Sequence, residues 1–413
     1  MKSINLFFQV HQPIRLTRFR FFDIGNSEYF YDDYQNEYFT RQATESCYLP
    51  ANKLLLDLIS RHQGKFKVTF SISGTAIDQF KIYAPEVLES FRELAATGCV
   101  EFVAETYSRS LASLNDKTEF RKQLEQHANA MAAIFGVRPT VFANTGLIYS
   151  DEIGAMVAEM GYKAILAQGS PHILEWRSPN YLYRNALQPS LSVLLKNSQL
   201  SDDLAFRFSD PNWSGWPLDA KKFVSWLNKI PEQEKIINLF MDYETFGERQ
   251  KPEAGIFDFL SALPSAVFKK SSFKFSTPAE TVEQYQPVDV LRASHPGYNG
   301  KETAQLSDWL GNDLQREAFE NLSKLSHQMH NCDHASLLKD WQYLQTKDHF
   351  FYMSTNHVHD DHSLVAFNPY DSPYDAFINY MNVLNDFTIR LERFAEKEQH
   401  QMIQYKKKIL AFA

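Results

Sequence analysis

Short apolar runs alternate with amphipathic segments through roughly the first 280 residues, and this alternation constrains the fold more than any other feature of the chain. The runs have the length of strands, and most are followed by polar or glycine-bearing turns. Strands are predicted over 4–10, 67–71, 100–104, 140–143, 164–167, 236–241 and 273–276. Helices are predicted between them over 85–97, 117–135 and 151–160. This order is typical of a parallel sheet or barrel.

From about residue 301 the pattern becomes helical, with predicted helices over 308–325, over 333–344 and from Ser372 onward. Ser372 suits the N-cap of the last helix, and Pro373 suits its first position. No repeat, low-complexity block or long linker is evident, so we expect this part to pack against the strands. The predicted division is a barrel domain over 1–290 and a helical domain over 291–413.

The charge of the chain argues against polyanionic partners. A formal charge of -8 and a pI near 5.9 leave no basic face for a nucleic acid or an anionic membrane. The apolar N-terminal stretch is too short for a signal peptide, and no stretch approaches the roughly 20 apolar residues that cross a bilayer. Cys47, Cys99 and Cys332 form neither a disulfide framework nor a metal-binding spacing. We therefore expect a cytoplasmic protein with a neutral partner, no nucleic-acid or membrane partner and no cofactor.

Polar residues gather directly after four of the predicted strands. The four segments are His11-Gln12-Pro13, Glu101 to Arg109, Asn144 to Ser150, and Met241 to Gln250. Active sites of barrels form where strands end and loops begin, so these segments are candidates for a site. Each also has a purely structural interpretation. His11 can be a hydrogen-bonded core histidine, and Glu105 can pair with Arg109 one helical turn away.

The segment MDYETFGERQ carries the clearest chemistry, because Asp242 and Glu244 directly follow an apolar strand. Strand alternation sends both side chains to the same side. Neighbouring, partly desolvated carboxyl groups have their pKa values pushed apart, which keeps one protonated as a general acid near neutral pH. The alternative is that both are helix N-cap groups or ion-pair partners of Arg249.

These segments resemble the ordered signature regions of glycoside hydrolase family 57, most closely its α-amylase branch. The matching stretches are HQP, GCVEFVAETYSRSLA, FANTGLIYSDEI, FMDYETFGERQ and SDWLGNDLQREAF, with QTKDHFFYMST and FNPYDSPYDAFINYMNVLNDF also fitting that branch. Five ordered motifs are far more specific than a lone HQP. The resemblance implies an α/β fold, an incomplete (β/α)7 TIM-like barrel followed by a C-terminal helical bundle. It also implies action on α-1,4-glucan or maltooligosaccharide with retention of configuration.

The resemblance assigns roles to particular residues. Asp242 matches the general acid/base, and His11 matches the histidine of the substrate pocket. Family members carry a glutamate nucleophile in N-T-E-L-I-Y, whereas this chain has Gly146 there. Arg109 and Arg249 stand where the branch usually has histidine, and added positive charge is unfavourable beside a developing oxocarbenium cation. We therefore expect a glucan-binding protein with impaired catalysis, a pseudoenzyme of the α-amylase type.

An active enzyme remains open as the alternative. A retaining mechanism needs two carboxyl groups about 5 to 5.5 Å apart, and an inverting one needs about 6.5 to 9.5 Å. Glu105, Glu244, Asp151 or Glu152 could then substitute in an α-glucan hydrolase or a 4-α-glucanotransferase. The missing side chain also predicts space in which a glucose ring sits deeper without being cut.

The predicted substrate-binding residues combine polar groups with aromatic rings, on which the apolar face of glucose stacks. They are His11, Gln12, Glu105, Tyr107, Arg109, Trp213, Trp216, Tyr243, Glu244, Arg249, Asp308 and Trp309.

Two histidine groups raise the question of a metal, His357, His359 and His362 in one and His327, His330 and His334 in the other. The first alternates with carboxylates and can ligate zinc, although a solvated loop is favoured. The second lies in the helical region. A metal-dependent deacetylase needs an Asp-His-His set at strand ends, so it ranks last. No metal is predicted.

Overall fold

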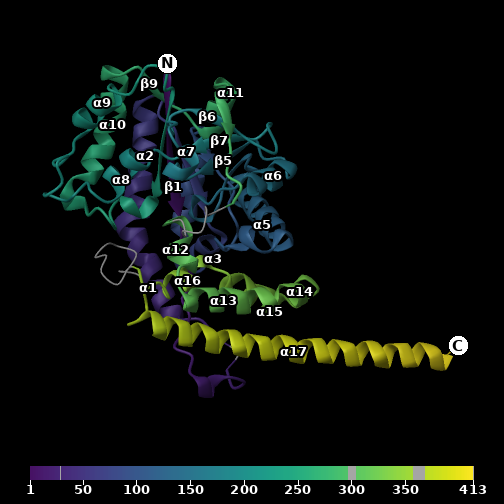
Figure 1. Ribbon diagram of the computed structural model, residues 1–413. Coiled ribbons are helices and arrows are strands. Elements are labelled where there is room, and N and C mark those ends of the chain that lie inside the picture. The colour runs from purple at the N-terminus through teal and green to yellow at the C-terminus, as the bar shows by residue number, and fades with distance from the viewer. Residues whose placement is uncertain (28, 296–303, 357–367, 413) are drawn as a thin grey trace.

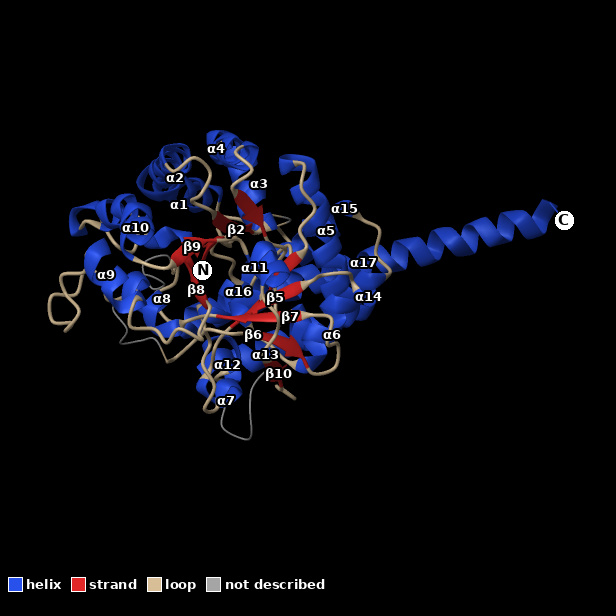
Figure 2. Ribbon diagram, turned by 90° about the horizontal axis from the view of Figure 1, so that it is seen from above, coloured by secondary structure: helices blue, strands red, loops and turns tan. Residues whose placement is uncertain are grey.

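The computed structural model describes residues 1–27, 29–295, 304–356 and 368–412, and it contains two β-sheets surrounded by helices (Figures 1 and 2). The strands are β1 (Lys2–Val10), β2 (Val68–Ile72), β3 (Val100–Phe102), β4 (Val141–Ala143), β5 (Ala164–Ala167), β6 (Leu182–Asn185), β7 (Ser192–Leu195), β8 (Ile236–Asp242), β9 (Phe273–Phe275) and β10 (Asp289–Leu291). All seven predicted strands are present. The strands β6, β7 and β10 are additional.

β1 lies at the centre of the first sheet. It pairs in parallel with β8 along its length, and on its other side first with β9 and then with β2. β3 extends this sheet beyond β2. The second sheet has the order β10-β6-β7-β5-β4, in which β6 and β7 are antiparallel and the other pairs are parallel.

The two sheets together form an incomplete barrel. A parallel bridge between Ala104 and Phe142 joins the end of β3 to β4, so β8, β1, β2, β3, β4, β5 and β7 follow one another around a ring. Between β7 and β8 there is no ladder in the described residues. The amide of Asn197 donates to the carbonyl of Asn238 at 2.9 Å, and the Asn238 side chain donates to the carbonyl of Leu195 at 2.8 Å. The predicted incomplete (β/α)7 architecture is confirmed.

Helices cover the outside of the strands (Figure 2). Around the strands lie α1 (Asp33–Ala43), the π-helical turn η2 (Thr44–Tyr48), α2 (Leu49–Arg61), α3 (Gly74–Tyr83), α4 (Pro85–Ala96), α5 (Lys117–Phe135), α6 (Asp151–Glu159), α7 (Pro171–Leu174), α8 (Ser198–Ala205), α9 (Ala220–Leu227), α10 (Ile256–Lys270) and α11 (Pro278–Gln284). The C-terminal region adds α12 (Ala304–Leu310), α13 (Asp313–Lys324), α14 (Ser326–His330), α15 (Ala335–Leu344), α16 (Lys347–Phe351) and α17 (Pro373–Phe412).

The helix predicted over 308–325 is wrong as a single element. Asn312 interrupts it, because its side chain accepts from the amide of Gln315 while the Gln315 side chain accepts from the amide of Asn312. This capping box starts α13 as a separate helix. The predicted start of the last helix is confirmed, since the Ser372 hydroxyl accepts from the amide of Asp375 at 3.2 Å.

The C-terminal helices share a core with the second sheet. One cluster of buried side chains contains Phe142 and Ile165 of that sheet together with Trp341, Tyr380 and Leu391 of the helical region. This common core holds the helices on the barrel, as the sequence predicts. The exact division into domains at residue 290 stays a prediction.

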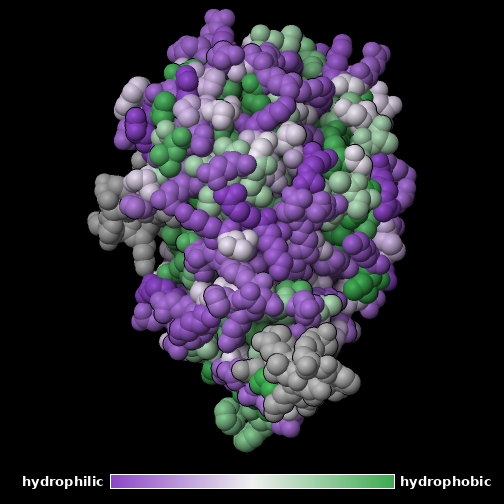
Figure 3. Space-filling view, turned by 90° about the vertical axis from the view of Figure 1, so that its right-hand side faces the viewer, coloured by the Kyte–Doolittle hydropathy of each residue, from purple (hydrophilic) through white to green (hydrophobic). Residues whose placement is uncertain are grey.

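The surface carries no extended apolar belt on the face shown in Figure 3, where hydrophobic residues are scattered among hydrophilic ones. Within the described part of the chain, no helix has both the length and the apolar character needed to cross a bilayer. The C-terminal half of α17 runs clear of the remaining helices (Figures 1 and 2).

Candidate functional site

A cavity of about 1220 Å³ opens at the carboxyl ends of β1 and β8. This is the edge at which barrel enzymes build their sites. Nine of the predicted site residues line its wall, namely His11, Gln12, Arg109, Gly146, Asp242, Glu244, Arg249, Asp308 and Trp309. The structure therefore brings together residues from all four polar segments and from the C-terminal helices.

Three other predicted site residues lie behind the cavity wall and do not line it. Tyr243 follows Asp242 in the chain and alternation turns its ring to the opposite side, where it is fully buried and stacks near Phe8. Tyr107 is buried and donates to a carboxylate oxygen of Asp78 at 3.0 Å. Glu105 has no exposed surface and accepts from the Gln9 amide at 3.3 Å. None of the three lines the cavity, so they support the wall from behind instead of contacting substrate as predicted.

Trp213 and Trp216 also lie outside the cavity wall. Trp213 packs edge-on against Trp226 with ring centroids 5.9 Å apart, as part of the apolar core beside α9. Trp216 is half exposed on the loop that precedes α9. Neither ring lines the cavity, so their contact with a bound sugar stays a prediction.

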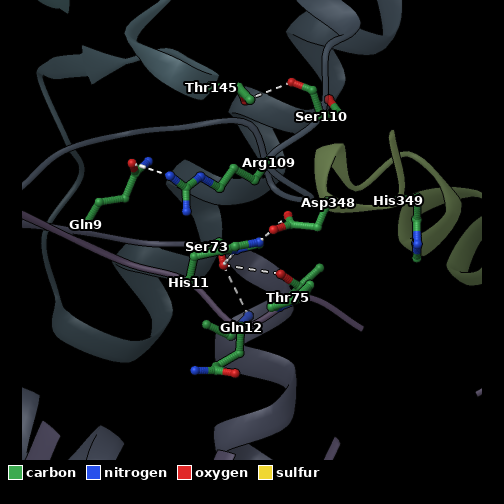
Figure 4. Close-up of polar contacts among 12 residues, drawn as sticks. Gln9, His11, Gln12, Ser73, Thr75, Arg109, Ser110, Thr145, Asp348 and His349 are labelled. Carbon is green, nitrogen blue, oxygen red and sulfur yellow. Dashed lines mark hydrogen bonds and ion pairs between the residues drawn. The ribbon is translucent and has the colours of Figure 1, made fainter. Parts of the chain in front are cut away.

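His11 is held in one orientation by two hydrogen bonds (Figure 4). Its Nε2 lies 2.8 Å from a carboxylate oxygen of Asp348, and its Nδ1 lies 2.8 Å from the hydroxyl of Ser73. Burial lowers the pKa of His11 to about 4 despite the neighbouring carboxylate, so the ring is neutral at pH 7. Since an ionised carboxylate only accepts, Nε2 carries the proton and Nδ1 accepts from Ser73.

Asp242 is held between two arginines. Its Oδ2 lies 3.1 Å from Nη2 of Arg249, and its Oδ1 lies 3.6 Å from Nη2 of Arg109. Burial would raise the pKa of Asp242, but the charges of Arg249, Arg109 and Lys347 outweigh it and lower the pKa to about 2. Arg109 also donates to the side-chain oxygen of Gln9 at 2.5 Å and has a left-handed φ of 52°. Asp242 is therefore an anion at neutral pH.

Glu244 has the opposite environment on the same wall. The hydroxyl of Tyr48 donates to its Oε1 at 2.5 Å, and the Gln12 side chain donates to that hydroxyl at 2.9 Å. Burial and the negative charge of Asp242 raise the pKa of Glu244 to about 7. The π-helical turn η2 ends at Tyr48 and places its ring here. The two carboxyl groups thus differ in protonation at neutral pH.

Gly146 packs directly against the indole ring of Trp309. Its φ is 61°, in the left-handed region that favours glycine. A Cβ at this position would overlap Cη2 of Trp309 and lie 2.7 Å from its Cζ3. The ammonium of Lys347 lies over the Trp309 ring, 5.1 Å from its centroid. The predicted free space at Gly146 is therefore absent, because Trp309 fills it.

The sequence of this chain is similar to those of known proteins. The model of the family described as glycosyl hydrolase family 57 matches residues 5–294. The chain belongs to glycosyl hydrolase family 57. A protein of Methanocaldococcus jannaschii, provisionally named an alpha-amylase, is 36% identical over 405 residues, which is 95% of this chain and 85% of that protein.

Solved structures share the fold of this family 57 chain. A branching enzyme of the family from Thermococcus kodakaraensis matches with a TM-score of 0.67 and 13% identity, over 94% of this chain and 90% of that one. A 4-alpha-glucanotransferase from Thermococcus litoralis matches with a TM-score of 0.58 and 15% identity, over 92% of this chain. This family 57 chain spans 55% of the length of that glucanotransferase.

Several residues at the wall of this family 57 protein were not predicted from the sequence. Gln9, Arg15, Lys347 and Asp348 line the cavity, and the buried Tyr48 lies behind the wall and donates to Glu244. Lys347 and Asp348 begin α16 and lie in the stretch QTKDHFFYMST, which was matched to the family without any residue being singled out. Their position beside His11 comes from the tertiary packing of α16, which no local spacing indicates.

The histidine groups do not supply a metal centre in the described part of this family 57 protein. Among described residues no group of three or more His, Cys, Asp or Glu side chains is arranged to hold a metal ion. His330 instead pairs with Asp116 at 2.9 Å, and His334 is the N-cap of α15. His357, His359 and His362 lie outside the described residues.

Proposed function

We propose that this family 57 protein binds α-1,4-glucan or maltooligosaccharide in the cavity and is impaired in cleaving it, as a pseudoenzyme of the α-amylase type. The single observation that carries the proposal is the contact between Gly146 and Trp309. At the position that the family resemblance assigns to the nucleophile there is no carboxylate, and an indole ring occupies the space a side chain would need. No nucleophile is therefore present at this position to attack an anomeric carbon.

The state of Asp242 supports the same conclusion. A general acid must carry a proton at the working pH, and a pKa of about 2 leaves almost none on Asp242 at pH 7. Both arginines that lower it stand where the α-amylase branch usually has histidine. Loss of the nucleophile and of the protonated acid together removes both halves of a retaining double displacement.

The remaining wall suits a neutral sugar chain. Gln12, His11 and Asp308 bring amide, imidazole and carboxylate groups to the cavity, and Trp309 brings an aromatic ring. Carbohydrate hydroxyls hydrogen-bond to the amide and the carboxylate, whereas both ring nitrogens of His11 are already bonded to Asp348 and Ser73. The part of the Trp309 ring that faces the cavity offers an apolar contact to a hexose. A cavity of about 1220 Å³ has room for several sugar units.

Isothermal titration calorimetry with maltoheptaose tests the proposal, with cellohexaose, a β-linked glucan oligomer, as control. We expect saturable heat with maltoheptaose, little heat with cellohexaose, and intact maltoheptaose when the sample is recovered and chromatographed. The absence of heat with maltoheptaose, or equal heat with both sugars, would refute the proposal.

A second candidate is an active hydrolase or 4-α-glucanotransferase in which Glu244 replaces the missing carboxylate. One observation favours it. Of Glu105, Glu244, Asp151 and Glu152, all within the described residues, Glu244 alone lines the cavity, and its pKa of about 7 suits proton transfer. The test is product release from maltoheptaose by the wild type and by Glu244→Gln. Product in the wild type that disappears in the variant would support it, and no product from either would exclude it.

We also propose a cytoplasmic location with no nucleic-acid or membrane partner. The formal charge of -8 and three free cysteines, two of them buried, support this. Cell fractionation with an antibody to the native protein tests it, and recovery of most of the protein with membranes or with nucleic acid would contradict it.

A further inference from the structure

Two tyrosines of α1 are exposed on the side of the helix that leads into the cavity. Tyr34 is 79% exposed and Tyr38 is 54% exposed. Their ring centroids are 6.5 Å apart and their planes differ by 17°, so the rings are nearly parallel. Tyr38 itself belongs to the cavity wall. Exposed aromatic surface is therefore continuous with the cavity.

The spacing along α1 explains this arrangement. Tyr34, Tyr38 and Gln42 are separated by four residues each, so they share one helix face and succeed one another at about 6 Å. Gln42 also lines the cavity and donates to Glu248 at 3.1 Å. The face thus runs from the outer surface at Tyr34 to the inner wall at Gln42.

The opposite face of α1 fixes the helix in place. Asn36, Thr40 and Ala43 are buried, and Thr40 donates to the Gln79 side chain of α3 at 3.1 Å. The Asp32 side chain caps the helix by accepting from the amide of Gln35 at 2.9 Å. The two tyrosines are consequently presented by a rigid element, and they need no ordering of the backbone to bind a ligand.

Single exposed aromatic residues are common on protein surfaces and need no explanation. Two parallel rings at the mouth of a cavity differ from that case, because together they make one aromatic surface that reaches the cavity wall at Tyr38. The separation of the rings is comparable with the length of a hexose unit. The CH face of a sugar ring stacks on such a surface, while its hydroxyls stay in water.

We propose that Tyr34 and Tyr38 form an aromatic track on which the part of an α-glucan chain outside the cavity rests. The proposal rests on the proposed function, that the cavity binds α-glucan. Its consequence is a preference for long chains, since a chain that fills only the cavity never reaches Tyr34. The neutral sugar also fits the chemistry of the track, which consists of uncharged rings.

The test compares calorimetric affinities for maltotriose and for a longer chain such as maltoheptaose or soluble amylose. Tyr34→Ala is expected to weaken binding of the longer chain by about threefold to tenfold and to leave maltotriose unchanged. Tyr34→Phe keeps the ring and is expected to bind both as the wild type does. Trp176→Ala is the matched control, since Trp176 is 86% exposed but does not line the cavity.

The outcomes separate the two proposals. Wild-type affinity of Tyr34→Ala for the longer chain would overturn the track while the cavity still binds glucan. Equal loss in Tyr34→Ala and Trp176→Ala would overturn it as well, because the effect would not belong to the track. If the wild type binds neither sugar, the proposed function itself fails. Thermal unfolding of each variant checks the fold, which is expected to be unchanged because both side chains are exposed.

Discussion

Replacing Gly146 with alanine should destabilise the protein through two separable effects. A left-handed backbone costs a residue with a Cβ roughly 1 to 2 kcal/mol. Forcing an extra carbon into a packed contact costs roughly 1 to 3 kcal/mol more. A Cβ at Gly146 meets both conditions, with φ of 61° and Cζ3 of Trp309 at 2.7 Å. We therefore expect Gly146→Ala to lower the free energy of unfolding by about 2 to 5 kcal/mol.

Gly136→Ala is the matched control for the backbone effect. Gly136 has φ of 70°, but nothing lies within 4 Å of a Cβ built there, so this variant should lose only about 1 to 2 kcal/mol. Urea unfolding followed by circular dichroism measures both variants. In a Trp309→Phe background, whose ring is smaller, the extra loss from Gly146→Ala should shrink. If Gly146→Ala is no less stable than Gly136→Ala, Trp309 does not fill the position and the reasoning is refuted.

Two further predictions concern protonation. Arg249→Gln removes the nearer ion pair of Asp242, so the pKa of that carboxyl should rise from about 2. A carboxyl ¹³C NMR titration measures this pKa, and an unchanged value would show that Arg249 does not lower it. Burial lowers the pKa values of His11, His127 and His349 to about 4, below the unfolded value of about 6.5. The unfolded chain then takes up protons that the native state does not, so these residues make stability rise with pH between about 4 and 6.5. His11→Asn should reduce the difference between the free energies of unfolding measured with urea at pH 4.5 and at pH 7. A difference as large as in the wild type would argue against a buried neutral His11.

The sequence predicts the barrel well where a strand is a clear apolar run. The runs at β1 and β8 are long and apolar, and the two strands pair with each other along most of their length. It fails at β6, β7 and β10. β6 reads LYRN and β7 reads SVLL, four residues each, and pairing with neighbours rather than composition makes them strands. Such pairing is a property of the assembled sheet.

The site was predictable as far as it follows strand ends. His11, Asp242 and Glu244 lie directly after β1 or at the end of β8, and alternation correctly sends both carboxylates to one wall. The same rule, applied to Tyr243, would have placed its ring in the core. Asp348 could not be found in this way, because it lies 337 residues from His11 and meets it only when α16 packs on the barrel.

A crystal structure of the protein soaked with maltoheptaose tests the central claim most directly. The account predicts an intact α-glucan chain across the cavity, with the indole of Trp309 still against Gly146 and no carboxylate oxygen within bonding reach of an anomeric carbon. A covalent glycosyl adduct, a cleaved chain, or a carboxylate such as Glu244 poised for attack beneath an anomeric carbon would contradict it.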